Sequence, residues 1–450
     1  MATAPQAPGQ RPGQQPDPDL QTGIQYLRAG WFDRAEPLFR AAHTRYGDRP
    51  DLLHFLAVCL SQRGALGEAA DLWRKAIARD PKEPMLTFNL GIVTRRMGLL
   101  DEAAKNFRDT IRRAPTHVEA RLALAGVHID QGKFTAAERE LVEVASNLDR
   151  AIEHPDGANL RPVQARTRNM LGHVLYRLTH YGPAIEVLDM ALNDAGEDAG
   201  RRAQILGDRA LALNGLGHHD EAIAEAGKAL ALAPENGSIN HVMGFVLYFA
   251  GKVSDALPPI QKALDLGFTP ALRTLALAQV AAGKTDDAVA TLQRAIRQNP
   301  RDRDAVLQLS LLHIEKEQFE PALATLDPYL KAMPDDIRAL NNRGLALRGL
   351  KRFEEAQRSL KRASRLATDD PFVLTNLGRV LVDLGRAAEA LPLHEHALRV
   401  LPGHAALLTH YGICLLTLGN KDRARETLDA ALAADPDSQE ALAARTSVDA

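Results

Sequence analysis

Two stretches far apart in the chain follow one pattern: LTFNLGIVTRRMGLLDEAAKNFRDTIRRAP at residues 86–115 and LLTHYGICLLTLGNKDRARETLDAALAADP at residues 407–436. In each stretch, a glycine stands seven residues before a second glycine. An alanine follows that second glycine by five residues, and a proline follows the alanine by twelve. Self-similarity at a fixed spacing indicates an array of structural repeats.

The same frame fits the chain twelve times. The alanine column is complete and contains Ala35, Ala69, Ala103, Ala137, Ala184, Ala222, Ala256, Ala288, Ala322, Ala356, Ala390 and Ala424. Twelve residues before each alanine stands a small residue, in the order Gly23, Ala57, Gly91, Ala125, Gly172, Ala210, Gly244, Ala276, Ser310, Gly344, Gly378 and Gly412. So complete a pair of columns is not expected by chance, even in an alanine-rich chain.

Each unit of this frame reads as two helices joined by a turn. Two apolar stripes of helical period, each about a dozen residues long, flank a turn that usually carries a glycine, as at Gly98 and Gly419. Glycine permits the left-handed conformation that ends a helix, and proline cannot continue one. The small residues allow two helices to approach closely. One helix pair cannot bury its own apolar face, whereas stacked neighbours can. The chain is therefore predicted to be an all-α solenoid of antiparallel helix pairs.

These columns and the prevailing spacing of 34 residues resemble the tetratricopeptide repeat (TPR) family over about residues 16–438. The resemblance implies a right-handed superhelix whose first helices line a concave groove. It also implies a protein-interaction scaffold rather than an enzyme. Trp31 and Trp73 lie outside the tryptophan position of that family, and we expect both to be packed.

The spacing of the alanines also predicts the domain boundaries. The interval from Ala137 to Ala184 is 47 residues instead of 34, and the extra segment contains a Pro-Asp-Gly turn signal. We therefore expect a lengthened helix and an inserted surface loop at 152–164. The predicted organisation is a disordered Pro/Gln-rich leader at 1–15, repeats 1–4 at 16–151, the loop at 152–164, repeats 5–12 at 165–438 and a capping helix at 439–450.

Composition narrows the class of partner. The net charge is −2 and the sequence pI is about 6.7, which argues against a nucleic-acid binder. No apolar run approaches the roughly 18 residues of a spanning helix, which argues against membrane insertion. The first ten residues lack the basic and apolar regions of a secretory signal, so we expect a cytoplasmic protein.

A search for active-site motifs finds no convincing candidate, and we expect no enzyme, cofactor or metal site. The segment AQVAAGKT at 278–285 resembles a phosphate-binding loop, but Gly283 falls at an ordinary repeat turn. His394 and His396 are two residues apart, so on a helix they point to different sides and cannot share a metal. His394 falls at a position usually held by a large core residue. Cys59 and Cys414 face the packed interior, where thiols act as small hydrophobes.

The resemblance places partner contacts on the first helices, at positions 2, 5, 6, 9, 12 and 13 of each repeat. The predicted N-terminal patch contains His54, Phe55, Phe88, Asn89, Arg95 and Arg96. The middle patch contains Asn169, His173, Tyr176, Arg177, His241, Phe245, Tyr248 and Phe249. The C-terminal patch contains Gln308, Arg338, Asn341, Asn342, Asn376, Arg379 and His410.

Four residues of the C-terminal patch, all at position 6, are each 34 residues apart: Gln308, Asn342, Asn376 and His410. Side-chain amides both donate and accept, so such a ladder could pair with the backbone of an extended peptide. The other interpretation is that position 6 is polar because it faces solvent. The residues around Asn89 and Asn342 do not match the carboxylate clamp of the family. The three aromatic residues at 245, 248 and 249 are either an interaction hot spot or core residues of a shifted helix.

The predicted function is capture of a peptide segment or partner helix in the concave groove. Two alternatives stay open. The chain could recruit substrates for a separate glycosyltransferase- or sulfotransferase-type subunit, since related repeat arrays occur fused to such domains. It could also bind a second copy of itself and form a homo-oligomer.

Overall fold

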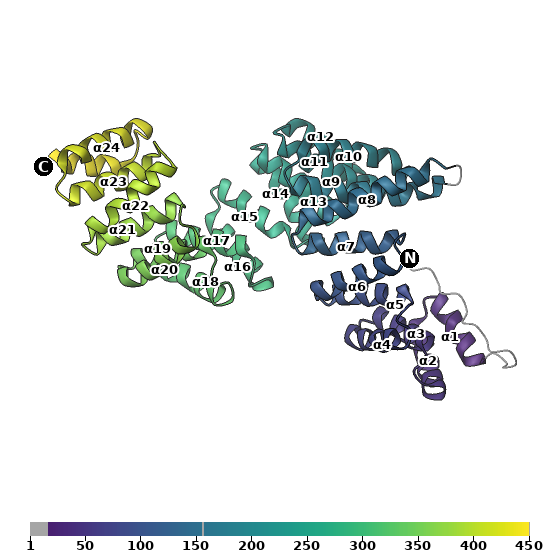
Figure 1. Ribbon diagram of the computed structural model, residues 1–450. Coiled ribbons are helices and arrows are strands. Elements are labelled where there is room, and N and C mark those ends of the chain that lie inside the picture. Colours follow the sequence, from purple (N-terminus) through teal and green to yellow (C-terminus); the bar gives the residue numbers. More distant parts are fainter. Residues whose placement is uncertain (1–16, 155–156, 450) are drawn as a thin grey trace. The chain divides into compact units, whose positions relative to one another are not determined.

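A computed structural model describes residues 17–154 and 157–449. Within this part of the chain every regular element is a helix (Figure 1). The predicted leader at 1–15 lies outside the described residues. The chain divides into two compact units, Met1–Ala250 and Gly251–Ala450, which we call unit 1 and unit 2. The predicted all-α solenoid class is confirmed.

Unit 1 contains thirteen α-helices and one short 3-10 helix among its described residues. They are α1 (Pro18–Arg28), α2 (Phe32–Tyr46), α3 (Pro50–Gln62), α4 (Leu66–Arg79), α5 (Pro84–Arg96), α6 (Leu100–Arg113), α7 (Val118–Asp130), α8 (Phe134–Ile152), η1 (Gly157–Leu160), α9 (Arg161–Arg177), α10 (Tyr181–Asp194), α11 (Ala199–Gly215), α12 (His219–Leu232) and α13 (Gly237–Phe249).

Unit 2 contains twelve α-helices in its described part. They are α14 (Val253–Asp265), α15 (Ala271–Ala281), α16 (Thr285–Gln298), α17 (Arg303–Glu315), α18 (Phe319–Ala332), α19 (Ile337–Gly349), α20 (Phe353–Leu366), α21 (Pro371–Asp383), α22 (Ala387–Val400), α23 (Ala405–Thr417), α24 (Lys421–Ala434) and α25 (Gln439–Asp449). Odd-numbered helices are the first helices of the repeats, and α25 takes the place predicted for the cap.

Where the small-residue column carries glycine, one large side chain of the second helix packs directly against that glycine. We call this packing position the seat of the repeat. A Cβ added to Gly344 would lie 2.4 Å from Cγ of Leu360, and one added to Gly412 would lie 2.6 Å from Cγ of Leu428. Glycine therefore lets the two helices of a repeat approach until a core side chain rests on the backbone. The alanine column is buried throughout the array, as at Ala356 and Ala424.

The turns inside the repeats share one backbone conformation whether or not they carry glycine. Gly98 has φ 76°. Where the sequence lacks that glycine, Thr179, Glu317 and Lys351 adopt the same left-handed region with φ 63°, 56° and 59°. Packing of the two helices thus imposes the turn, and the three side chains there bear a conformational cost of about 1 kcal/mol each.

The inserted segment is more helical than predicted. Helix α8 extends to Ile152, η1 follows, and α9 begins at Arg161, inside the loop expected at 152–164. Pro162 occupies the first turn of α9, where proline is favoured, rather than a loop. Leu148 of α8 and Leu171 of α9 belong to one hydrophobic cluster, so the core continues across the insertion. The two compact units meet at 250/251, whereas the sequence analysis expected its two blocks of repeats to meet at the insertion.

Candidate functional site

First helices of neighbouring repeats contact one another directly. In unit 2 these contacts join α17 to α19, α19 to α21, α21 to α23 and α23 to α25, and in unit 1 they include α9 with α11 and α11 with α13. In a curved stack of helix pairs, the first helices of neighbouring repeats touch on the concave side, because the stack is shortest there. We call this side the inner face of each unit. The residues of the predicted patches all belong to first helices.

The N-terminal patch is partly core. The prediction that Phe55 lines the groove is wrong, because its ring is 2% exposed and stacks on Phe39 with 5.2 Å between centroids. His54 accepts a hydrogen bond at Nδ1 from Trp73 Nε1 at 3.1 Å. Burial lowers the pKa of His54 to about 4. His54 and Trp73 therefore join the two helices of the second repeat.

The remaining N-terminal residues are more accessible. Phe88 and Asn89 are half-buried on α5, and Phe88 packs against His117 with 4.8 Å between ring centroids. Arg95 forms an ion pair with Asp130 of α7 at 2.7 Å. Arg96 donates to the backbone oxygen of Ser61 at 3.0 Å. Both arginines thus link neighbouring repeats.

Two residues of the middle patch converge on a carboxylate that the sequence analysis missed. Asn169 Nδ2 donates to Asp208 of α11 at 2.6 Å, and His173 Nδ1 lies 3.1 Å from its other oxygen. Burial alone would lower the pKa of His173, but the hydrogen bond and charge of Asp208 raise it above its ordinary value. Asp208 lies two residues before the small-residue column of its repeat, the same register as the polar ladder, so that register was the available signal.

The rest of the middle patch is aromatic. Arg177 lies over the ring of Phe134, 4.4 Å from its centroid, and Tyr176 is half-buried beside it on α9. On α13, Phe249 is 48% exposed and its ring lies 4.6 Å from that of Phe245 and 5.2 Å from that of Tyr248. Phe245 and Tyr248 are half-buried, as is His241. Part of this cluster is therefore core and part is surface.

Two hydrogen bonds join polar side chains of the C-terminal patch to the preceding repeat. Asn342 Nδ2 donates to Ser310 Oγ of α17 at 3.1 Å, and Asn376 Nδ2 donates to Asn341 Oδ1 of α19 at 2.9 Å. Gln308 is half-buried and Arg338 is exposed. Two of the four ladder residues, Asn342 and Asn376, are thus each tied to the preceding repeat.

His410 is the last of the four ladder residues, and its ring is largely buried. Burial first, and the charge of Arg379 second, lower the pKa of His410 to about 2. The imidazole is therefore neutral near pH 7 and has one donor and one acceptor nitrogen.

The other motifs of the sequence are structural. Cys59 and Cys414 are fully buried, and burial raises the pKa of the two thiols to about 12 and about 11. Helix α15 ends at Ala281 and Gly283 forms the turn with φ 74°, so the 278–285 segment is an ordinary repeat turn. In the described ranges, no group of three or more His, Cys, Asp or Glu residues is arranged to hold a metal.

The two histidines of the His-x-His pair separate as predicted. His394 is 1% exposed and occupies the glycine seat of its repeat, where Nε2 lies 2.5 Å from a Cβ added to Gly378. His396 is on the surface and pairs with Asp369 at 3.0 Å.

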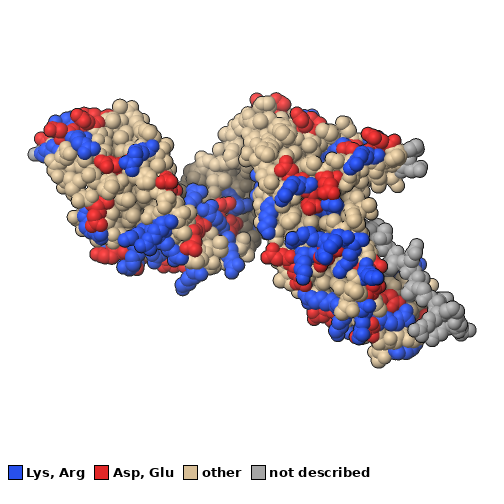
Figure 2. All heavy atoms as spheres, viewed as in Figure 1, with Lys and Arg blue, Asp and Glu red and all other residues tan. Residues whose placement is uncertain are grey.

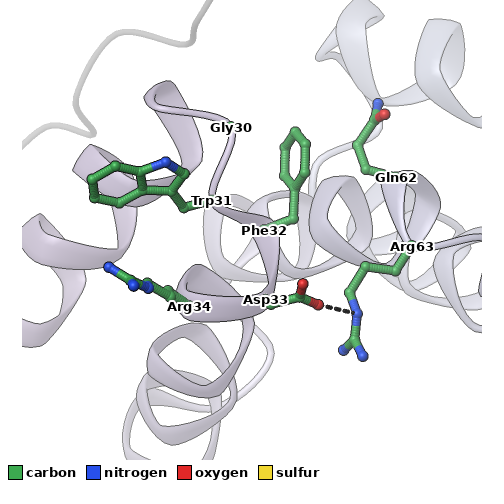
Figure 3. Close-up of a pocket in the computed structure, with 7 residues that line it drawn as sticks. All are labelled: Gly30, Trp31, Phe32, Asp33, Arg34, Gln62 and Arg63. Carbon is green, nitrogen blue, oxygen red and sulfur yellow. Dashed lines mark ion pairs between the residues drawn. The ribbon is translucent and has the colours of Figure 1, made fainter.

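One surface hollow lies outside the predicted patches. Its volume is about 740 Å³, and it is lined by the turn before α2 and the end of α3 (Figure 3). Trp31 borders it with 53% of its surface exposed, which corrects the prediction that this tryptophan is packed, whereas Trp73 is buried as expected. Asp33 and Arg63 form an ion pair at 2.7 Å across the hollow. Trp31 precedes α2, and Tyr26 of α1 and Arg34 of α2 lie against its ring.

Charges of both signs are interspersed on the face of the molecule shown in Figure 2. Many pairs join successive repeats, such as Arg273 with Asp304 at 2.7 Å and Arg303 with Asp336 at 2.6 Å. The acidic and basic residues thus largely neutralise one another along the stack, in keeping with the net charge of −2. None of the helices in the described part is both long and apolar enough to span a bilayer.

Sequence profiles described as tetratricopeptide repeat match residues 20–84, 88–155, 203–236, 279–342, 335–401 and 381–448. These matches cover most of the chain. The chain therefore belongs to the tetratricopeptide repeat family. No curated protein matches the sequence.

Several solved structures are similar to this chain. Yeast Tom70 is 15% identical with a TM-score of 0.46, covering 90% of this chain and 96% of its own. The APC/C hetero-tetramer Cut9–Hcn1 is 14% identical with a TM-score of 0.47, covering 95% of each chain. A tetratricopeptide repeat protein from Parabacteroides merdae is 18% identical with a TM-score of 0.46, covering 56% of this chain and all of its own.

Proposed function

We propose that this protein is a non-enzymatic adaptor that holds a segment of a partner protein on the inner face of unit 2. The proposal rests on one observation. The polar residues of α17, α19 and α21 form a row in which side chains of neighbouring repeats hydrogen-bond to one another, and His410 of α23 continues the same register. A row of amides with the spacing of a repeat array suits an extended chain.

The chemistry of the row supports binding of backbone rather than of one particular sequence. Each side-chain amide has two donor hydrogens and an oxygen that accepts two bonds. The bond from Asn342 to Ser310 uses one donor hydrogen, and the bond from Asn376 to Asn341 uses another. The second donor hydrogen of each of these two amides has no other partner among the hydrogen bonds of the described residues, and we propose that it binds the peptide. Because neighbouring repeats already hold the side chains in place, little ordering of the scaffold accompanies binding.

The test is the double variant Asn342→Ala with Asn376→Ala. Wild type and variant are immobilised, exposed to an extract of the native source, and the retained proteins are quantified by mass spectrometry. The strongest partner is then purified and titrated by calorimetry. We expect the double variant to bind it about tenfold more weakly, since each lost hydrogen bond contributes about 0.5–1.5 kcal/mol.

The control variant is Gln293→Ala with Gln298→Ala, which removes two exposed amides from the second helix α16. It should bind the partner like wild type, and all three proteins should have the same helical circular dichroism. Equal affinity of the ladder variant and wild type would contradict the proposed role of the row.

A further inference from the structure

An incompletely neutralised arginine lies at the end of the polar row. Arg379 of α21 has 23% of its side chain exposed, and His410 of α23 has 10%. Arg379 Nη1 lies 3.4 Å from Asn376 Oδ1, at the long limit of a hydrogen bond, and its Nε is buried without a partner. We call Asn376, Arg379 and His410 the Arg379 cluster.

Several other arginines of unit 2 have a carboxylate at close distance. Arg303 and Arg343 contact Asp336 and Asp327 at 2.6 Å and 2.7 Å. Arg348 of α19, which is near the cluster, forms an ion pair with Asp383 at 2.5 Å. Asp383 is therefore engaged by Arg348 at a short distance, and no equally close carboxylate faces Arg379 among the described residues.

The acid nearest to the Arg379 cluster comes from the capping helix. Oε1 of Glu440 on α25 lies 4.0 Å from Arg379 Nη2 and 3.6 Å from His410 Nδ1. Both distances exceed those of charge-assisted hydrogen bonds, which are about 2.7–2.9 Å. The Glu440 side chain is also 53% exposed. This carboxylate approaches the cluster without closing on it.

The surroundings of the cluster are electrostatically unfavourable for a cation. Burial and the nearby charge of Arg348 lower the pKa of Arg379, although Glu440 and Asp383 oppose the shift. Both ring nitrogens of the buried His394 on α22 also lack a hydrogen-bond partner. A buried cation that is not fully paired is costly, so an additional anion at this position stabilises the site.

We propose that the Arg379 cluster binds a side-chain carboxylate of an acidic segment of the partner protein, and that Glu440 competes weakly for this position in the free protein. A carboxylate matches the planar fork of a guanidinium, and the neighbouring amide and imidazole supply further polar contacts. The chain's own Glu440 shows which chemistry the cluster attracts. This inference rests on the proposed function, because the acidic segment would be the segment held by the row.

The test begins with a library of random twelve-residue peptides displayed on phage and selected on the full-length protein. We expect the selected peptides to be richer in Asp and Glu than the library. The strongest one is synthesised with a fluorescent label, and its affinity is measured by fluorescence anisotropy. We expect Arg379→Gln to weaken binding about tenfold and Arg379→Lys to weaken it less, since lysine retains the charge without the fork.

Two further variants test whether a change in binding comes from the Arg379 cluster or from the loss of any surface charge. Glu440→Gln should tighten binding about threefold by removing the competing carboxylate, and it alters an exposed residue, so it decides the question if Arg379→Gln does not fold. Arg294→Gln, an exposed arginine of α16, should bind like wild type.

The outcomes distinguish the two proposals. Selected peptides without acidic enrichment, or equal binding by wild type, Arg379→Gln and Glu440→Gln, would overturn the role of the cluster but leave the inner face as a peptide site. If no peptide is enriched at all, the proposed function itself is contradicted, and this inference with it.

Discussion

Repeats 11 and 12 have the same pattern of small residues, but the side chain that packs against the glycine of that pattern is polar in repeat 11 and apolar in repeat 12. In repeat 12, Gly412 of α23 seats Leu428 of α24, and in repeat 11, Gly378 of α21 seats His394 of α22. Leu428 is 0% exposed and His394 is 1% exposed, so both side chains are core. Leucine has no polar atom to satisfy, whereas neither ring nitrogen of His394 has a hydrogen-bond partner. Leaving such a group unpaired costs about 1–3 kcal/mol.

In these two repeats the seat holds a large side chain in both cases, but the polarity of that side chain differs. An empty seat beside a glycine would leave a cavity, whereas repeat 6 pairs Ala210 with the small Ala226. A polar occupant is tolerated, since the stability of a repeat array is shared among many local interfaces. Repeat 11 is also the repeat that supplies Asn376 and Arg379 to the inner face. The unpaired polar side chain of the core therefore belongs to the same repeat as part of the proposed binding site.

The largest effect should come from filling the seat of repeat 12. Gly412→Leu forces a side chain into Leu428, because even a Cβ would lie 2.6 Å from its Cγ. We expect a loss of about 3 kcal/mol of stability. Hydrogen exchange with mass spectrometry should show α23, α24 and α25 losing protection before α15–α18.

Gly227→Leu provides the matched control, since no atom lies within 4 Å of a Cβ added there in α12. It should retain wild-type stability or exceed it. Uniform loosening of the whole chain by Gly412→Leu would contradict the view that each interface is local.

The second effect is a pH dependence of stability that His394 in repeat 11 should cause and Leu428 in repeat 12 should not. Burial lowers the pKa of His394 to about 4 from an ordinary value of 6.5. The unfolded chain therefore binds a proton that the folded chain does not, and stability falls as the pH decreases from about 6.5 towards 4. Between pH 7.5 and pH 5 this one group should cost about 2 kcal/mol.

Urea denaturation of wild type and His394→Leu at both pH values measures this contribution. The variant should lose about 2 kcal/mol less than wild type on acidification, because leucine makes repeat 11 like repeat 12. The pKa shift of His54 does not involve His394, so it cancels in the comparison. The pKa of His410 stays lowered in both proteins, because burial and the charge of Arg379 contribute more to its shift than His394 does. An identical pH dependence of the two proteins would show that His394 does not titrate as a buried neutral group.

The smallest effect concerns the turns. Lys351 in repeat 10 adopts φ 59°, whereas the corresponding turns of repeats 11 and 12 carry Gly385 and Gly419 with φ 72° and 77°. Lys351→Gly should stabilise the protein by about 0.5–1 kcal/mol, because glycine adopts this conformation without steric cost. The reverse exchange, Gly385→Lys, should destabilise by a similar amount. Denaturation midpoints measure both, and the same sign of change for the two variants would rule out the conformational explanation.

The candidate surface was predicted from register with mixed success. The columns place Asn342 and Asn376 on successive first helices, and the structure joins each of them to the preceding repeat. The same column includes Phe55, which packs into the core against Phe39. Register predicts the face of a helix on which a residue lies, but neighbouring side chains decide whether that face is covered. Trp31 is the opposite case, since too few neighbours reach its ring to bury it.

The sequence by itself determined the repeat unit, its boundaries over most of the chain, the helix pairs and the core columns. These depend on local properties: helical period, the need for glycine at a tight turn, and the volume that a close approach of two helices permits. The membership of the tetratricopeptide repeat family follows from the same columns.

Only the tertiary structure decided where the chain divides into units, which predicted groove residues are buried, and which charges meet. Glu440 approaches Arg379 from a helix about sixty residues further along the chain, and Asp208 joins Asn169 and His173 from the next repeat. Such contacts depend on the curvature of the stack and on side-chain conformations summed over several repeats. No single repeat contains that information, because each repeat specifies only its contacts with its neighbours.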